Sequence, residues 1–162
     1  MTDSNALLMP IPDGLVATGA ATADFEPLAD LADLPSGRML RVTRGDLDLL
    51  LVNSESGICV IDDRCPHMAA PLSLGMLDGC VVACPLHRGR FDVSDSSIVQ
   101  FPTTGGLDAD GGYHAPWTPS DSAPKAEPTD LKAMARAATR VRRLRYYPVR
   151  IEGGKIEVRL PR

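Results

Sequence analysis

The chain of 162 residues is 44% hydrophobic and carries a net charge of −4, which suits one globular domain and disfavours a disordered segment. No apolar run approaches the roughly 20 residues of a membrane span, and no Lys or Arg precedes Arg38. We therefore expect no membrane or nucleic-acid partner, no secretory signal, and a cytoplasmic protein whose four Cys indicate metal binding or buried thiols rather than disulfides.

The charges are unevenly distributed along the chain. Residues 1–128 hold 7 basic and 18 acidic residues, whereas residues 129–162 hold 10 basic and 3 acidic residues. Two solvated faces, or a surface that steers docking by charge, are both consistent with this division.

The first 22 residues look like an extension, because Pro10, Pro12 and Gly14 interrupt any helix. From Phe25 the chain consists of short runs of aliphatic and β-branched residues separated by turns, which predict strands. The predicted strands cover residues 38–45, 46–53, 57–62, 79–84, 89–93 and 97–101.

Residues 103–128 are crowded with Gly, Pro, Asp and Ser and are predicted to form a long loop. Residues 129–143 are the one convincing helix, with Pro128 before it and Thr129 or Asp130 as its cap. Its apolar stripe, expected to pack on the β core, comprises Leu131, Met134, Ala138 and Val141. Its basic residues should face solvent, either as part of a decorative insertion or as a docking or assembly element.

Residues 146–160 close the chain as a hairpin that turns at Gly153–Gly154. The predicted fold is therefore all-β, with about ten short strands and one loop–helix insertion over residues 103–143.

Two stretches, CPHMAAPL and CPLHRGRFD, each hold a cysteine and a histidine close together. They pair Cys65 with His67 and Cys84 with His87, in the spacings C-x-H and C-x-x-H. Two thiolates and two imidazoles can hold one tetrahedral zinc ion. They can also hold a 2Fe–2S cluster in which the cysteines bind one iron and the histidines bind the other.

The spacing favours the cluster, because zinc loops usually begin with two cysteines, whereas each loop here contributes one thiolate and one imidazole. The sequence closely resembles the Rieske family over about residues 25–101 and 144–160. The matching positions are Cys65, Pro66, His67, Leu72, Gly75, Cys84, Pro85, His87, Phe91 and Asp92. A structural zinc site and a degenerate domain without metal are the alternatives.

The resemblance implies antiparallel sheets and a cluster-binding subdomain built from two loops, here residues 63–93 within a domain over residues 23–162. It also implies one Rieske-type 2Fe–2S cluster. The ligands would be Cys65, His67, Cys84 and His87. The chain departs from the family pattern at Ala69 and Arg88, where Gly is common.

Three further residues of metal-binding type have plainer interpretations. Cys59 and Cys80 lie in strand-like runs and are expected to be small buried hydrophobic residues. Neither matches a ligand position of the family. His114 lies in the Gly- and Pro-rich loop and is expected to be solvated.

Several functions within this family are disfavoured by the sequence. Members that oxidise quinols carry an extra cysteine in each loop, at positions that are Ala70 and Leu86 here. Oxygenase catalytic subunits need a second iron held by two histidines and a carboxylate, and only His114 is left for it. No Gly-rich dinucleotide motif follows a strand, so the chain should not take electrons from its own nicotinamide or flavin.

The remaining class resembles the soluble ferredoxins of ring-hydroxylating dioxygenase systems. The chain would then be no enzyme but a one-electron carrier, reduced by a flavin-dependent reductase and oxidised by a terminal oxygenase or similar enzyme. The alternative is a non-catalytic small subunit or regulatory module of a nitrite-reductase-like enzyme. The oligomeric state stays open.

The resemblance also implies how electrons would enter and leave. The outer edges of His67 and His87 would form the electron route, and Pro71, Leu72 and Leu86 an apolar rim around the cluster.

The redox potential is expected to be low. High-potential relatives place Ser and Tyr hydroxyl groups at the positions of Gly89 and Phe91, and neither residue here has a hydroxyl.

Overall fold

The computed structural model describes residues 6–124, 126 and 130–162. This part of the chain forms thirteen short strands, one α-helix and three 3-10 helices, which confirms the predicted all-β class. The first strands are β1 (Phe25–Asp30), β2 (Arg38–Arg44), β3 (Leu47–Ser54) and β4 (Gly57–Asp62). The middle strands are β5 (Met76–Asp78), β6 (Val81–Ala83), β7 (Arg90–Asp92), β8 (Ile98–Gln100), β9 (Gly106–Leu107) and β10 (Tyr113–His114). After helix α1 (Leu131–Ala138) come β11 (Tyr146–Tyr147), β12 (Val149–Glu152) and β13 (Lys155–Arg159). The 3-10 helices are η1 (Ala20–Thr22), η2 (Leu31–Asp33) and η3 (Leu72–Leu74).

Strands β3 and β4 form the central layer of the molecule. They lie in the antiparallel sheet β11-β4-β3-β2, and alternate side chains of a strand point to opposite faces. Leu49 and Leu51 pack toward the sheet β1-β13-β12, while Leu50 and Val52 pack toward the cysteine–histidine loops. Because both faces are covered, β3 is a nearly continuous apolar run instead of an alternating one.

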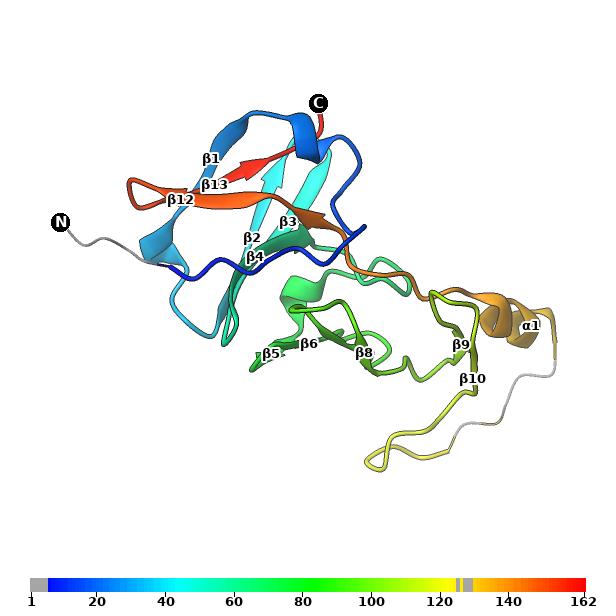
Figure 1. Cartoon of the computed structure of the whole chain (residues 1–162). Coiled ribbons are helices and arrows are strands. Elements are labelled where there is room, and N and C mark those ends of the chain that lie inside the picture. The colour runs from blue at the N-terminus through cyan, green and yellow to red at the C-terminus, as the bar shows by residue number, and fades with distance from the viewer. Residues whose placement is uncertain (1–5, 125, 127–129) are drawn as a thin grey trace.

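A second antiparallel sheet, β5-β6-β7-β8, carries the cysteine–histidine loops. It lies below the β1–β4 body in Figure 1 and joins the body through a shared apolar core. Tyr146 of β11 crosses between the two parts, and its hydroxyl donates a 2.6 Å hydrogen bond to the carbonyl of Val93.

The N-terminal segment packs on the body rather than extending from it. From residue 6 onward it lies along β4 and β11, with isolated parallel bridges from Leu8 to Ile58 and from Val16 to Tyr146. Its side chains Met9, Ala17 and Ala20 are buried. The expected extension over residues 1–22 thus contributes to the core through its described part, residues 6–22.

The insertion differs from the prediction in two ways. Residues 103–128 were predicted to be a long loop, but they contain the two-stranded ladder of β9 and β10. Helix α1 is shorter than residues 129–143, and its N-cap is Asp130, whose carboxylate accepts a hydrogen bond from the N–H of Lys132. Pro128 and Thr129, the other residues considered at this end, lie outside the described residues.

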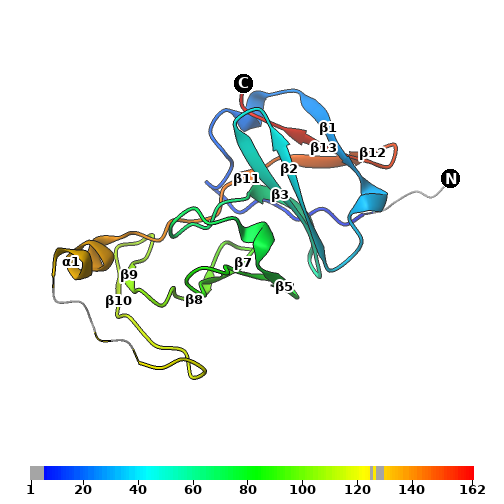
Figure 2. The same cartoon turned by 180° about the vertical axis from the view of Figure 1, so that it is seen from behind.

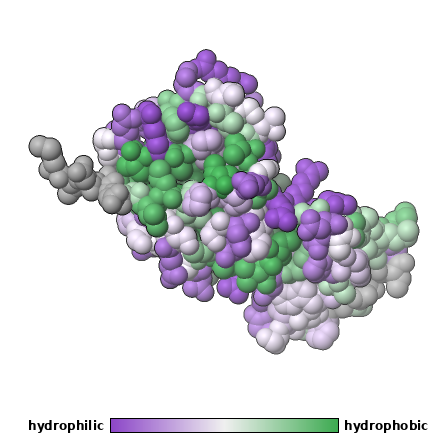
Figure 3. Space-filling view, viewed as in Figure 1, coloured by the Kyte–Doolittle hydropathy of each residue, from purple (hydrophilic) through white to green (hydrophobic). Residues whose placement is uncertain are grey.

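The expectation that the helix packs its apolar stripe on the β core is wrong. Leu131 is 80% exposed and Met134 is 68% exposed, because α1 lies at the far end of the molecule, beside β9 and away from the body (Figures 1 and 2). Figure 3 shows apolar residues at that end of the surface. Of the expected stripe, only Val141, which follows the helix, is fully buried.

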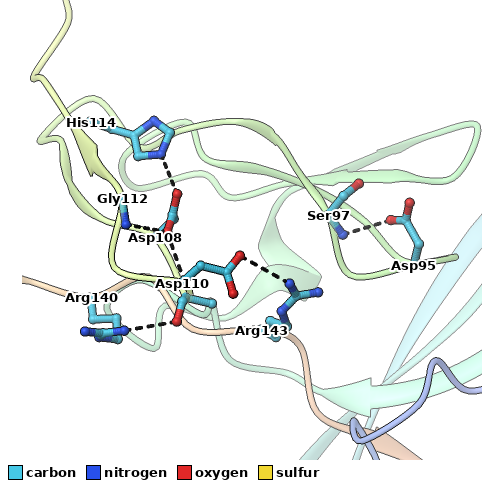
Figure 4. Close-up of polar contacts among 9 residues, drawn as sticks. Asp95, Ser97, Asp108, Asp110, Gly112, His114, Arg140 and Arg143 are labelled. Atoms are coloured by element: carbon cyan, nitrogen blue, oxygen red, sulfur yellow. Dashed lines mark hydrogen bonds and ion pairs between the residues drawn. The ribbon is translucent and has the colours of Figure 1, made fainter.

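Polar contacts hold the insertion in shape (Figure 4). The Asp108 carboxylate lies 2.9 Å from Nε2 of His114 and accepts the backbone N–H of Gly112 at 2.8 Å. Arg140 donates to the carbonyl of Ala109. His114 also stacks on Phe101, with ring centroids 4.1 Å apart. It is therefore a structural residue of the hairpin and not a merely solvated loop residue.

Within the described residues, no helix combines the length and apolarity that crossing a membrane would need.

Candidate metal centre

The first loop begins directly after β4 and is closed at its base by a buried carboxylate. Asp63 accepts hydrogen bonds from the backbone N–H of Ser73 at 2.7 Å and from its hydroxyl at 2.6 Å. Arg41 of β2 lies 3.4 Å from the same carboxylate. A charged group buried at this depth is stable only when it is paired in this way. Asp63 therefore fixes the two ends of the loop that carries Cys65 and His67.

The turn of the first loop requires unusual backbone geometry. The N–H of Cys65 donates to the carbonyl of Ala70, and the N–H of Ala69 donates to the carbonyl of Cys65. Ala69 has a φ of 59°, which is the left-handed region that favours glycine. A Cβ on Gly75 would lie 1.8 Å from the carbonyl oxygen of Ala83, so this position accepts no side chain.

The second loop joins β6 to β7 and repeats this geometry. The N–H of Cys84 donates a 2.8 Å hydrogen bond to the carbonyl of Gly89. Arg88 has a φ of 58° and thus corresponds to Ala69 of the first loop. The two departures from the family pattern are therefore the two loop positions with left-handed backbone.

The four predicted ligands form two pairs, each with one residue from each loop. Cys65 and Cys84 are both buried, and each shifts the pKa of the other. The rings of His67 and His87 stand edge to face, with centroids 4.9 Å apart. In the described part of the chain, no group of three or more His, Cys, Asp or Glu side chains gathers at one point. The observed pairs of sulfurs and of imidazoles match the donor set of a cluster with two chemically different irons.

The two sulfurs have opposite pKa shifts, and only Cys84 is shifted toward the thiolate form. The pKa of Cys84 is lowered to about 6, chiefly by the hydrogen bond from the Cys65 thiol and also by the N–H groups of Leu86 and His87. That shared proton, together with burial, raises the pKa of Cys65, although the N–H groups of His67 and Met68 oppose the rise. Each sulfur thus faces backbone donors two and three residues further along its own loop.

The histidines are held neutral. Burial lowers the pKa of His67 to about 4, with His87 as a second cause. Burial also lowers the pKa of His87, and Arg136 adds to the effect. A histidine binds metal as the neutral imidazole, so both histidines are in the form that a metal site needs.

The insertion contacts both loops. The N–H of Thr103 donates to the carbonyl of His87 at 2.9 Å, and Oγ1 of Thr104 lies 3.1 Å from Nε2 of His67. From the other end of the insertion, the N–H of Arg142 donates to the carbonyl of Pro66.

The expected apolar rim is only partly present. Leu86 is 59% exposed beside His87, as a rim residue should be. Leu72 is fully buried in the core beneath the loops, because η3 turns it inward. It can shield the site but cannot form an outer surface.

The other two cysteines have structural surroundings. Burial raises the pKa of Cys59 to about 12, which agrees with its prediction as a small buried residue. Cys80 is half-buried, and its sulfur lies 3.0 Å from the hydroxyl of Ser56.

Two residues of the site were not singled out from the sequence. Asp63 had a detectable signal, since it follows a predicted strand and directly precedes the first loop. Thr104 had none, because 37 residues separate it from His67.

Comparisons with known proteins agree with this geometry. A family profile described as "Rieske [2Fe-2S] domain" matches residues 24–110. The chain is 40% identical over 74 residues to the naphthalene 1,2-dioxygenase system ferredoxin component of Pseudomonas aeruginosa, covering 46% of this chain and 71% of that protein. A ferredoxin component of naphthalene 1,2-dioxygenase/salicylate 5-hydroxylase systems from Ralstonia sp is 36% identical over 51% of this chain and 80% of that protein. Among solved structures, Sphingomonas yanoikuyae B1 ferredoxin shares the fold, with a TM-score of 0.54 and 22% identity over 85% of this chain and all of that one.

Proposed function

Because this chain belongs to the Rieske [2Fe-2S] domain family, we propose that Cys65 and Cys84 hold one iron of its cluster and that His67 and His87 hold the other. The observation that supports this assignment most directly is the division of the four side chains into a sulfur pair and an imidazole pair.

The cluster supplies a one-electron redox couple, and the chain's own residues set the conditions for it. Buried Leu72, Val82 and Phe91 keep water from the inner side of the loops. The backbone N–H groups directed at Cys65 and Cys84 stabilise negative charge on the sulfurs. His87, half-buried between exposed neighbours, offers the edge through which an electron can pass to a docked protein.

The chain is an electron carrier and not itself a catalyst. Its relatives from Pseudomonas aeruginosa and Ralstonia sp are ferredoxin components of dioxygenase systems. We propose that it accepts one electron from a flavin-dependent reductase and delivers it to a terminal oxygenase, in the cytoplasm, where free thiols persist.

The ligand assignment is tested on the purified full-length chain. We expect two irons and two sulfides per chain and a Rieske-type electron paramagnetic resonance (EPR) spectrum after reduction. His67→Ala and His87→Ala should each abolish that spectrum, because one iron would lose half of its protein ligands. Cys59→Ser and Cys80→Ser are the matched controls and should retain it. A histidine variant with the wild-type spectrum would disprove the assignment.

The carrier function needs a separate measurement. Stopped-flow mixing of the oxidised chain with an NADH-driven dioxygenase reductase should transfer one electron per chain, and the reduced chain should then support turnover of a partner oxygenase. Reduction without delivery to any oxygenase tested would contradict a carrier role in such a system while leaving the cluster assignment intact.

A further inference from the structure

A tight turn of the insertion lies over both metal-binding loops. The turn spans residues 102–105 and is closed by the N–H of Gly105, which donates to the carbonyl of Pro102 at 3.0 Å. Of its two central residues, Thr103 bonds the second loop through its backbone, at the carbonyl of His87. Thr104 contacts the first loop through its side chain, at Nε2 of His67.

The position of this turn is fixed by its backbone contacts. The N–H of Trp117 donates to the carbonyl of Thr103 at 3.0 Å. Gly105 has a φ of 65°, and a Cβ there would lie 2.5 Å from the carbonyl oxygen of His114 and 2.6 Å from the nitrogen of Pro116. Only glycine fits a backbone packed this closely, so the hydroxyl of Thr104 is placed by the fold and not by a freely rotating loop.

The two histidines have different surroundings as a result. His67 is 9% exposed, whereas His87 is half-buried and flanked by the exposed residues Leu86 and Arg88. A ring N–H that is withdrawn from water needs an acceptor, since an unpaired buried donor is costly. Thr104 is the acceptor that the structure gives to His67.

We propose that Thr104 is a positioning residue for His67. This inference rests on the proposed ligand set. If Nδ1 of His67 binds iron through its lone pair, Nε2 carries the ring proton. This N–H then donates a hydrogen bond to the hydroxyl oxygen of Thr104. That hydrogen bond fixes the plane of the ring and makes the imidazole a stronger electron donor to the metal. A stronger donor favours the oxidised state, so Thr104 lowers the midpoint potential.

The test compares three variants by EPR-monitored redox titration at neutral pH. Thr104→Val keeps the shape of the side chain but removes the hydroxyl, and Thr104→Ser keeps the hydroxyl. Thr103→Val is the matched control at the neighbouring position. Thr103 bonds the second loop through its backbone N–H, which this substitution leaves in place. We expect Thr104→Val to raise the midpoint potential. At a fixed potential, the ratio of reduced to oxidised protein should increase roughly twofold to tenfold, and tenfold corresponds to 59 mV for one electron. Thr104→Ser and Thr103→Val should stay at the wild-type value.

Each result supports or overturns the proposal. Thr104→Val and Thr104→Ala could also lose the cluster while Thr104→Ser retains it. That result would support the proposal, because it would show that the hydroxyl is needed to hold His67 in place for the cluster. An unchanged potential in Thr104→Val, or a Thr104→Ser protein that behaves like the valine variant, would overturn it. Wild-type protein without the Rieske signal would instead overturn the proposed ligand set, and with it this inference.

Discussion

Two residues in the metal-binding loops have backbone conformations that their side chains disfavour. Ala69 and Arg88 are both left-handed, at positions where the family commonly has glycine. A non-glycine residue pays about 1–2 kcal/mol for this conformation. The exposed ion pair of Arg88 with Asp121 offsets little of it, because ion pairs in contact with solvent stabilise a fold weakly.

Replacing Ala69 with Gly should therefore stabilise the protein. The relief of strain exceeds the extra entropy of unfolded glycine, about 0.5–1 kcal/mol, so we expect a net gain of up to about 1 kcal/mol in the free energy of unfolding. Denaturant unfolding of the cluster-loaded protein measures it. Ala70→Gly is the control, because Ala70 is the next residue and does not have a positive φ. This substitution should destabilise the protein. Equal effects of the two substitutions would show that backbone strain is not the cause.

The lack of hydroxyl groups beside the sulfurs should set the redox potential. Phe91 is buried, and its Cζ lies 3.0 Å from where a Cβ of Gly89 would be, inside the second loop. Wild-type protein should have a midpoint near the low end of the roughly −150 to +300 mV range of Rieske centres.

Phe91→Tyr should raise that potential, because a hydroxyl at Cζ adds a hydrogen-bond donor to the second loop. Redox titration of the variant against wild type measures the shift. Phe101→Tyr, a residue that stacks on His114, is the control. A wild-type midpoint above about +150 mV, well inside the family range, would contradict the explanation.

Among the elements, the β9–β10 hairpin depends most on one side chain. The Asp108 carboxylate joins His114, Gly112 and the N–H of Asp110. The bond to His114, followed by that to Gly112, lowers the pKa of Asp108. Folding therefore favours the ionised form of Asp108. The stability that this carboxylate contributes is fully present above the ordinary pKa of Asp and is lost as the pH falls through the lowered pKa.

Asp108→Asn should loosen this hairpin without removing the cluster. The neutral amide accepts weaker hydrogen bonds from His114 and the turn, so exchange of backbone hydrogens in residues 106–114 should become at least about fivefold faster. Mass-spectrometric hydrogen exchange at neutral pH measures it. Asp121→Asn removes a comparable carboxylate from an exposed ion pair and should leave this segment unchanged.

The sequence predicted some elements better than others for physical reasons. Strands β2, β3 and β4 were predicted to within a residue or two, because Gly45 and Gly57 mark their turns. Helix α1 has a real apolar stripe, but periodicity cannot show whether a partner surface lies against it, and Leu131 is exposed. The four ligand positions were predicted from local spacing and stay a prediction, whereas the contact of Thr104 depends on how a distant turn folds back.

At the scale of the whole molecule, a buried hydrogen bond from Tyr146 helps to connect the body to the loop-bearing sheet. Tyr146 belongs to the body sheet through its pairing with Ile61, yet its ring lies in the core that contains Cys65 and Cys84. Its hydroxyl bonds the carbonyl of Val93, directly after β7. Burial raises the pKa of this phenol, which therefore acts as a hydrogen-bond donor.

Tyr146→Phe should weaken the connection between the two parts. The buried carbonyl of Val93 would lose its donor, at a cost of about 1–3 kcal/mol. Chemical denaturation followed separately by the visible absorbance of the cluster and by far-ultraviolet circular dichroism measures it. We expect the two transitions to coincide in wild type and the absorbance to be lost first in the variant. A variant with wild-type stability would show that this hydrogen bond does not stabilise the junction. Tyr113→Phe, on an exposed tyrosine, is the control.

The contacts of the insertion with Pro66, His67 and His87 also affect how the protein matures. A segment that bonds both loops is most stable when the loops already stand in their final places. Metal insertion fixes those places, and binding energy of this kind appears as folding energy. Binding of the cluster should therefore also stabilise the insertion, and unfolding of the insertion should weaken the hold on the cluster.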